Sequence, residues 1–376
     1  MLTLYDESKP FRFHIELTDG CNARCPHCPR NLIEHTTKTL KAHPNLAGND
    51  ITFQQYKDIF KNYLNKTASV VFSGNFGDPV WNPEFSSILE YTVNNVLSEN
   101  NSYVKVCTNG GFRKPEWWTD LARKTKSKPL MCFAIDGLED THHLYRVNTR
   151  YDRVIANAKA WIAEGGKAEW QFIRMDHNKH QEAEAKRRAN ELGFTSFQVV
   201  VSNRGSIEEF NYKGIKYHIT APEETNIEEL PYTPVVKKQL KKLKENKGLH
   251  FGTNKDSDGM HQIIYEDVID CQEAEINRIY IDCEGFVYPC CWIGSHQYHV
   301  RNSTRTMYDT GNILFTKNAR EMDKAWNRSF IDILQDAWFE FILPTSWDNE
   351  PCSICSQNCG KRKTQTIRTS EHYGTN

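Results

Sequence analysis

The strongest constraint on the fold is a regular alternation of short β-rich runs and longer amphipathic stretches in the first half of the chain. Six apolar, β-branched runs are typical of strands: 11–17, 69–72, 103–107, 130–135, 168–173 and 197–201. Stretches with helical spacing of apolar residues lie between them: 53–64, 84–97, 115–122, 152–163 and 181–192. Strands that alternate with helices indicate βαβ units and a parallel sheet. We therefore expect an α/β fold, either a partial or complete β/α barrel or, as the alternative, an open doubly wound sheet.

The same pattern suggests how the chain is divided. A length of 376 residues is typical of two or three domains. The periodicity breaks near residue 203, and the segment to about residue 265 is polar and predicted to be loop-like. Cysteines return from Asp270 onward. We therefore expect a first domain over 1–205, a linker or substrate-specific segment over 206–265, and a smaller domain over 266–376.

Charge and hydropathy argue against two kinds of partner. Lys and Arg number 47 against 48 Asp and Glu, so the basic excess that favours nucleic-acid binding is absent. The Lys-rich stretch 236–247 is interpreted as a solvated helix face. No run approaches the length of a membrane span. The first residues carry early acids and no apolar signal core, so we expect a cytoplasmic protein.

Cysteine is the unusual component, with 12 residues. Because disulfides are rare in a reducing compartment, many cysteines there more often indicate metal binding or catalysis. Cys21, Cys25 and Cys28 follow the first predicted strand in the spacing C-x3-C-x2-C. A closed zinc site would need a fourth ligand, and His27 is adjacent to Cys28, an arrangement that rarely binds one ion. Three thiolates on a short loop suit a [4Fe–4S] cluster with one open iron, and a zinc knuckle is the alternative.

This spacing resembles the signature of the radical S-adenosylmethionine (radical SAM) family, C-x3-C-x-φ-C, with His27 at the φ position. The resemblance implies that Cys21, Cys25 and Cys28 hold a [4Fe–4S] cluster whose open iron binds S-adenosylmethionine. One-electron cleavage of the cofactor would then give a 5′-deoxyadenosyl radical that abstracts hydrogen from a substrate. The resemblance also implies a partial (β/α)6 TIM-like barrel, an active site at the carboxyl ends of its strands, and a flavodoxin- or ferredoxin-type electron donor.

Motifs after the other predicted strands extend the resemblance. Gly77-Asp78-Pro79 is similar to the family's Gly-Gly-Glu-Pro-like motif, and Thr108-Asn109-Gly110 also recurs in the family. Asp136 and Arg146 match a stretch whose Arg pairs with the cofactor carboxylate, although Ala134 stands where the family has Ser. The resemblance implies S-adenosylmethionine contacts at His27, Gly74, Gly77, Asp78, Asn109, Asp136 and Arg146. After the fifth strand, Asp176 and His177 are candidates for proton transfer.

The later cysteines resemble the SPASM/twitch extension of radical SAM enzymes. Cys271 is followed by 13 residues, Gly285, four residues and Cys290, while 279–281 and 286–288 read as a β-hairpin. The full cysteine run of the SPASM form is absent, so the shorter twitch form is expected, a small α+β iron–sulfur domain with one auxiliary [4Fe–4S] cluster. The expected ligands are Cys271, Cys290, Cys352 and Cys355, with Cys359, Cys291 and Cys283 as substitutes. A zinc site built from the same cysteines is the alternative.

Two classes of function follow from these motifs. The first is a radical SAM oxidoreductase or maturase that acts on a peptide or small molecule, with the auxiliary cluster assisting oxidation or formation of a new bond. The second is a zinc-stabilised module that binds nucleic acid or protein without catalysis. A radical SAM fold that no longer cleaves its cofactor is disfavoured by the intact cysteine triad. Cys107 and Cys132 lie inside predicted strands and are interpreted as small apolar core residues.

Overall fold

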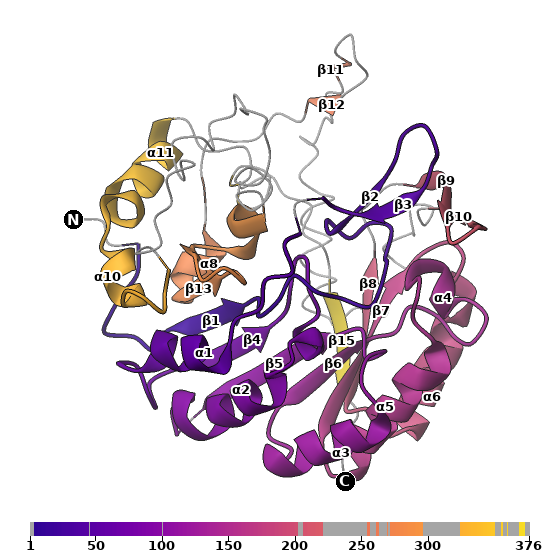
Figure 1. Cartoon of the computed structure of the whole chain (residues 1–376), viewed down its shortest axis with the longest axis horizontal. Helices are drawn as coiled ribbons and strands as arrows, with labels where there is room; N and C mark the ends of the chain where they lie inside the picture. Colours follow the sequence, from indigo (N-terminus) through magenta and orange to yellow (C-terminus); the bar gives the residue numbers. More distant parts are fainter. Residues whose placement is uncertain are drawn as a thin grey trace, which may run out of the picture.

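The computed structural model describes residues 4–44, 46–99, 101–201, 206–220, 254–255, 261–262, 269, 271–295, 324–349, 355, 359 and 368–372. Within this part the chain forms a curved nine-stranded sheet, in the order β14-β13-β1-β4-β5-β6-β7-β8-β15 (Figure 1). Six parallel strands make its centre: β1 (Arg12–Ile15), β4 (Ser69–Phe72), β5 (Tyr103–Thr108), β6 (Leu130–Ala134), β7 (Lys167–Arg174) and β8 (Ser196–Val201).

The order of these strands decides between the two predicted architectures. A doubly wound sheet reverses its strand order at a switch point. Here the six central strands are neighbours in chain order, as in a β/α barrel. The predicted α/β fold with a partial barrel is therefore confirmed, and all six predicted strands are present.

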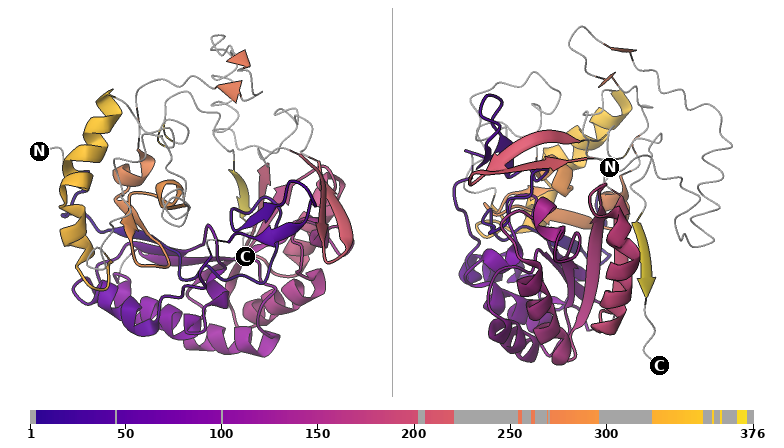
Figure 2. Two further views of the ribbon diagram at one scale, coloured as in Figure 1. Left: turned by 45° about the horizontal axis from the view of Figure 1, so that its top comes forward. Right: turned by 90° about the vertical axis from the view of Figure 1, so that its right-hand side faces the viewer.

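Helices cover the outer, convex side of the sheet (Figure 2). The five predicted helices form as α1 (Phe53–Phe60), α2 (Phe85–Tyr91), α3 (Pro115–Lys124), α5 (Tyr151–Ala163) and α6 (Glu182–Glu191). Shorter helical segments are α4 (His142–Tyr145), α8 (Gln272–Glu275), α10 (Phe330–Leu334), α11 (Leu343–Asn349), η1 (Pro79–Trp81), η2 (Thr92–Val96), η3 (Lys179–Gln181) and η7 (Trp338–Ile342). No helix in the described part of the chain is both long and apolar enough to cross a lipid bilayer.

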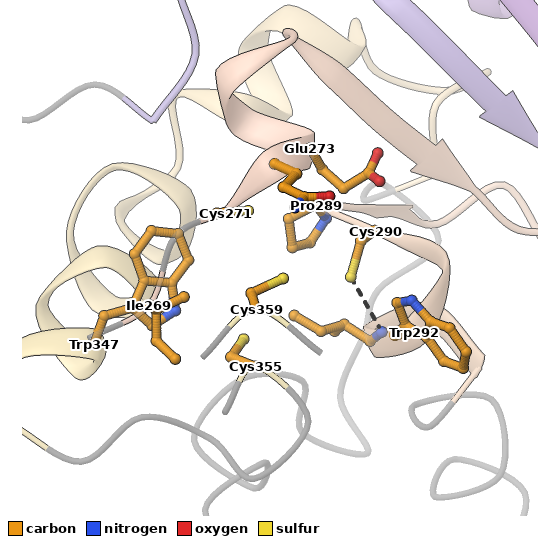
Figure 3. Close-up of a pocket in the computed structure, with 11 residues that line it drawn as sticks. Ile269, Cys271, Glu273, Pro289, Cys290, Trp292, Trp347, Cys355 and Cys359 are labelled. Carbon is orange, nitrogen blue, oxygen red and sulfur yellow. Dashed lines mark hydrogen bonds between the residues drawn. The ribbon is translucent and has the colours of Figure 1, made fainter. Parts of the chain in front are cut away.

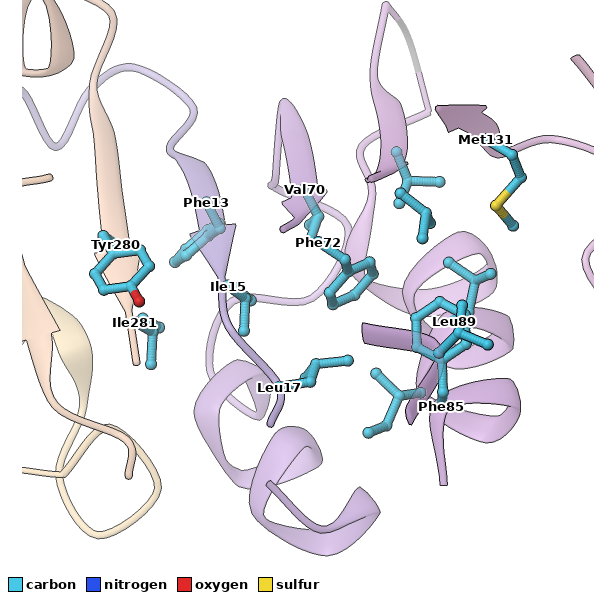
Figure 4. Packing of buried hydrophobic residues seen from close by; sticks show 14 of the residues in the cluster. Phe13, Ile15, Leu17, Val70, Phe72, Phe85, Leu89, Met131, Tyr280 and Ile281 are labelled. Carbon is cyan, nitrogen blue, oxygen red and sulfur yellow. The ribbon is translucent and has the colours of Figure 1, made fainter. Parts of the chain in front are cut away.

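The main hydrophobic core lies between the sheet and these helices. Alternate residues of each strand point toward the helices, so Phe13 and Ile15 of β1 and Phe72 of β4 are fully buried. They share one cluster with Phe85 and Leu89 of α2 (Figure 4). The opposite faces of the same strands line the concave side of the sheet, where polar residues gather. The core therefore fixes which side chains face the interior of the barrel.

The C-terminal hairpin extends the same sheet. β13 (Arg278–Ile281) and β14 (Val287–Tyr288) pair antiparallel, which confirms the predicted hairpin. Gly285 in its turn has φ +87°, a conformation that glycine adopts without strain. β13 also pairs parallel with β1, with Tyr280 opposite His14. This pairing brings the later cysteines close to the first strand.

The segment predicted to be loop-like contains a second hairpin. β9 (Ile207–Tyr212) and β10 (Ile215–Ile219) pair antiparallel around Lys213-Gly214, whose φ values of 49° and 81° suit a tight hairpin turn. The loop prediction was therefore wrong for 207–219. The hairpin is polar on most positions, but Phe210 and Ile219 are buried in the cluster that contains Cys25. The Lys-rich stretch 236–247 lies outside the described residues.

Smaller elements complete the structure. β2 (Asn31–Ile33) pairs with β3 (Leu40–Ala42), and β3 lies beside the β9–β10 hairpin. β11 (Asn254–Lys255) pairs with β12 (His261–Gln262), and β15 (Arg368–His372) runs antiparallel to β8.

Candidate active site

Two separate segments converge on the cysteine loop that follows β1. Asn109, directly after β5, points its Nδ2 at Cys21 Sγ across 3.5 Å. Arg146, after α4, lies with Nη1 3.7 Å from Cys25 Sγ. Within the loop, Ala23 N lies 3.3 Å from Cys21 Sγ. The loop therefore presents its sulfurs to N–H donors at the carboxyl edge of the sheet, where a β/α barrel places its site.

A buried arginine that the sequence analysis did not select fastens this loop. Arg30 donates from Nε to Phe76 O at 2.7 Å and from Nη2 to Asp19 O at 3.2 Å. Arg30 is 6% exposed, and its guanidinium also reaches Ala23 O. It thereby ties the cysteine loop to the loop after β4. No local pattern distinguishes it from a surface arginine, so the sequence held no signal for this role.

The Gly77-Asp78-Pro79 motif after β4 acts mainly by positioning Asn109, the residue that follows β5. Asp78 accepts hydrogen bonds from Thr108 Oγ1 at 2.9 Å, Asn109 N at 2.7 Å and Asn109 Nδ2 at 2.6 Å. Burial raises the pKa of Asp78 above its usual range, while these donors act in the opposite direction. The carboxyl group thus fixes the Asn109 amide that faces Cys21.

Glycine is required at Gly77 because the chain there packs against the loop after β1. A Cβ at Gly77 would lie 1.8 Å from Thr18 O. At Gly74 a Cβ would lie 2.2 Å from Gly77 O. Both predicted glycines therefore permit the close packing of two backbone segments beside the cysteines.

Asp136 and Arg146 form a buried ion pair rather than acting as separate groups. Arg146 Nε lies 2.5 Å from Asp136 Oδ2, and the Asp136 side chain is fully buried. Ile173 N donates to the other carboxyl oxygen at 2.7 Å. The pair therefore holds the guanidinium with one end at Cys25 Sγ, and this orientation depends on the burial of Asp136.

The remaining predicted residues are His27 in the cysteine loop and Asp176 and His177 after β7. The His27 ring is 5.8 Å from the ring of Tyr145. Asp176 pairs with Lys179 Nζ at 2.5 Å. The His177 ring nitrogens make no hydrogen bond within the described part of the chain, and burial lowers the pKa of His177 to about 4. His177 is therefore a neutral imidazole near neutral pH.

Glu16, directly after β1, is the most consequential residue that the sequence analysis missed. Its carboxyl group accepts hydrogen bonds from Phe76 N at 2.6 Å and Gly77 N at 2.9 Å. It also accepts one from the Tyr280 hydroxyl of β13. Asn75 Nδ2 reaches Tyr280 Oη at 3.2 Å, so one network joins β1, the loop after β4 and the C-terminal hairpin. An acidic residue inside an apolar strand sequence is the signal that could have found it.

A second group of cysteines lines one pocket beside the C-terminal hairpin (Figure 3). Cys271, Cys290, Cys355 and Cys359 all contribute to its wall, together with Trp292 and other residues. Cys271 and Cys359 are hydrogen-bonded to each other, and that bond, with burial, raises the pKa of the Cys271 thiol. The structure therefore brings together three of the expected auxiliary ligands and the first substitute.

The other candidate cysteines have different surroundings. Cys352 lies outside the described residues. Cys283 packs with Phe76 in a separate small cluster. Cys291 is absent from the residues that line the pocket, and its carbonyl oxygen accepts a hydrogen bond from Asn75 Nδ2 at 3.0 Å. Among these substitutes, Cys359 is the one that the pocket supports.

Both sets of cysteines fit iron–sulfur chemistry by their donors. Within the described ranges no group of three or more His, Cys, Asp or Glu side chains is placed to hold a single metal ion. A [4Fe–4S] cluster takes one cysteine thiolate at each iron that the protein holds. Burial raises the pKa of the Cys21 and Cys25 thiols, so their ionisation depends on the positive charge that iron supplies. N–H groups directed at sulfur support the negative charge of such a site.

Comparison with known proteins gives one family match and similarities in fold. Residues 15–182 match the family model of the Radical SAM superfamily. The solved structure of native anSMEcpe with bound AdoMet and Cp18Cys peptide is similar over 93% of this chain and 89% of that chain, with 14% identity and a TM-score of 0.50. SuiB from Streptococcus suis is similar over 89% of this chain and 68% of that chain, with 15% identity and a TM-score of 0.48. No curated protein matches the sequence.

Proposed function

Because residues 15–182 form a radical SAM domain, we propose that this chain is an enzyme that cleaves S-adenosylmethionine at a [4Fe–4S] cluster held by Cys21, Cys25 and Cys28. Such a cluster with its cofactor supplies a carbon-centred radical that abstracts hydrogen from the substrate. The observation that carries the proposal is the convergence of Asn109 and Arg146 on the sulfurs of this cysteine loop.

The residues around the cysteines would orient the cofactor and exclude competing reactions. We assign the cofactor's amino group to carbonyl oxygens of the loop 74–77, since an amino group needs acceptors. The N–H groups of Phe76 and Gly77 already donate to Glu16, which leaves carbonyl groups for this purpose. Asn109 and Asp136 would act as positioning residues, and His27 would flank the cofactor from the cysteine loop.

Proton transfer is assigned to the end of β7. A substrate radical that loses an electron also loses a proton, which needs an acceptor near neutral pH. His177 is a neutral imidazole there, and its ring nitrogens make no hydrogen bond within the described residues. Burial lowers its pKa to about 4, so a proton that it accepts near neutral pH is quickly lost again. We propose His177 as the acceptor, with Asp176 beside it as the second candidate.

The C-terminal pocket would hold one auxiliary [4Fe–4S] cluster. Four thiols complete such a cluster, and Cys271, Cys290, Cys355 and Cys359 supply four in one wall. The cluster would accept the second electron of a net oxidation, or of bond formation, in a peptide or small-molecule substrate. A flavodoxin or ferredoxin is the proposed donor of the first electron.

The decisive experiment measures iron, zinc and acid-labile sulfide per chain after anaerobic reconstitution, beside a Cys21→Ala/Cys25→Ala/Cys28→Ala variant. We expect about eight irons in the parent and about four in the variant. With dithionite as reductant, the parent should convert S-adenosylmethionine to 5′-deoxyadenosine and the variant should not. About one zinc with little iron and no 5′-deoxyadenosine would refute the enzyme and leave the zinc-stabilised binding module.

A matched pair of variants tests the auxiliary ligands. Cys359→Ala should lower the iron content by about four per chain while 5′-deoxyadenosine still forms. Cys291→Ala should leave the iron content unchanged, because Cys291 does not contribute to the pocket wall. Equal iron loss in both variants would contradict this assignment.

A further inference from the structure

Two thiols that the proposed reaction does not use lie side by side on neighbouring strands. Cys107 of β5 is the register partner of Cys132 of β6. Both are free thiols, and they are hydrogen-bonded to each other. Cys132 is 1% exposed, whereas Cys107 is partly exposed. The pair thus has one buried and one accessible member.

The pair faces the concave side of the sheet rather than the helix-covered core. Met131 and Phe133, which flank Cys132 in sequence, are fully buried in the main core. Because side chains alternate along a strand, Cys132 points to the opposite face. Cys132 is buried, as expected for a core residue, but it lies on the face of the sheet opposite to the main core.

Their neighbours on the concave face are polar and charged. Glu169 of β7 is the next register partner of Cys132. Its carboxylate lies 2.6 Å from Lys105 Nζ and 3.4 Å from Ser196 Oγ. The hydrogen bond from Cys132 lowers the pKa of the Cys107 thiol, and the positive charge of Lys105 acts in the same direction. Burial and the Glu169 carboxylate act in the opposite direction, so the lowered pKa of Cys107 comes from its hydrogen bonds and from Lys105.

We propose that Cys107 and Cys132 form a redox-active dithiol that closes to an intramolecular disulfide on the concave wall of the sheet. Register partners on adjacent strands have Cα atoms about 5 Å apart, within the range that a disulfide bridges. The proposal rests on the register and surroundings of the pair. It does not depend on iron–sulfur clusters or on the proposed function.

The oxidant is assigned as a small disulfide such as oxidised glutathione. The Cys107 thiolate attacks one sulfur of this disulfide, and the first glutathione thiolate leaves. Cys132 then attacks Cys107 Sγ in the mixed disulfide, and the second glutathione thiolate leaves. In sum, two protein thiols lose two electrons and two protons, and one oxidised glutathione becomes two glutathione molecules.

The disulfide would join the two strands that lead into the candidate active site. β5 ends at Thr108 and continues directly into Asn109, and these two residues contact Asp78 and Cys21. β6 leads into Asp136, which holds Arg146. A disulfide between Cys107 and Cys132 would therefore link the two strands just before the segments that form both sides of that site.

The test equilibrates the full chain anaerobically in glutathione buffers of graded reduction potential. Acid quenching, alkylation with N-ethylmaleimide, proteolysis and mass spectrometry then identify linked peptides. We expect the Cys107 peptide joined to the Cys132 peptide, with loss of two hydrogen atoms, in the more oxidising buffers. Dithiothreitol should reverse the link, and Cys283→Ser should leave it unchanged.

The Cys107→Ser variant provides the specific control. It should give no linked peptide, and Cys132 should carry N-ethylmaleimide. The proposal is overturned if both cysteines of the parent remain separately alkylated in the most oxidising buffer. It is equally overturned if glutathione remains on Cys107 while Cys132 stays free, because the pair would then not close.

Discussion

Glu16→Gln should remove a loss of folding stability that the parent protein suffers as the pH rises toward about 7. Burial raises the pKa of Glu16 from 4.5 to about 7, although Tyr280, Phe76 and Gly77 all donate to its carboxyl group. A carboxyl group whose folded pKa lies above its unfolded pKa binds more protons in the folded state. Its contribution to stability is therefore complete below pH 4.5 and is lost as the pH rises through about 7.

The magnitude follows from the size of that shift. The difference between 4.5 and about 7 is worth roughly 3 kcal/mol once the pH exceeds the folded pKa. Glutamine has the geometry of the protonated acid. Its oxygen can accept from Phe76 N and Gly77 N, and its amide can donate to the Tyr280 oxygen. The Glu16→Gln variant should thus keep the network while losing the titration.

Urea unfolding followed by tryptophan fluorescence measures this directly. The free energy of unfolding of the variant minus that of the parent should rise by about 2–3 kcal/mol between about pH 5 and about pH 8. Glu99→Gln, at an exposed position, is the control and should leave the difference flat. A flat difference for Glu16→Gln as well would refute the reasoning, since Glu16 would then ionise alike in the folded and unfolded chain.

Three further changes test the packing that supports the site. Asp78→Ala leaves buried donors unpaired and should lower the free energy of unfolding by about 2–4 kcal/mol in urea titrations, while exposed Asp120→Ala should change it little. Gly77→Ala puts a Cβ 1.8 Å from Thr18 O, so the free energy of unfolding should fall by about 1–3 kcal/mol. Cluster loading, measured as iron per chain, should fall as well. Unchanged values of both would show that the two loops can move apart. Phe13→Ala should cost about 3–5 kcal/mol in calorimetry, and a loss below about 1 kcal/mol would mean that the core collapses around it.

Hydrogen bonds of Asn75 join the cysteine loop after β1 to the C-terminal hairpin. Asn75 Nδ2 donates to the Cys291 backbone carbonyl oxygen at 3.0 Å, and the backbone carbonyl oxygen of Asn75 lies 3.6 Å from Cys28 Sγ. Glu16 and Tyr280 support the same junction. The cysteine loop and the C-terminal hairpin are thus held against each other by side chains from the first strand and the loop after β4.

The central fold could be predicted because its signals are local. Strands such as 69–72 and helices such as 152–163 follow from the periodicity of apolar residues, which reflects burial on one face. The hairpin at 207–219 escaped prediction because only Phe210 and Ile219 are deeply buried, and their partners come from distant segments. A short, mostly polar hairpin carries little periodicity of its own.

The candidate site was predictable in part for the same reason. Cys21, Cys25 and Cys28 are close in sequence, so their spacing alone indicated cluster chemistry. Arg30 and Glu16 carry no such spacing, because their partners Phe76 and Tyr280 are distant along the chain. The choice of Cys359 beside Cys271 likewise required a structure, since the sequence ranked Cys359 only as the first substitute.

The sequence by itself determined the parallel α/β core, the cysteine loop after the first strand and the hairpin near Cys290, because each depends on residues that are neighbours along the chain. Only the tertiary structure decided that Asp136 holds Arg146 at Cys25, that β13 joins β1, and that Cys107 and Cys132 face the interior of the barrel. These features depend on strand register and on the burial of charges. Both are set by contacts between segments that no local pattern records.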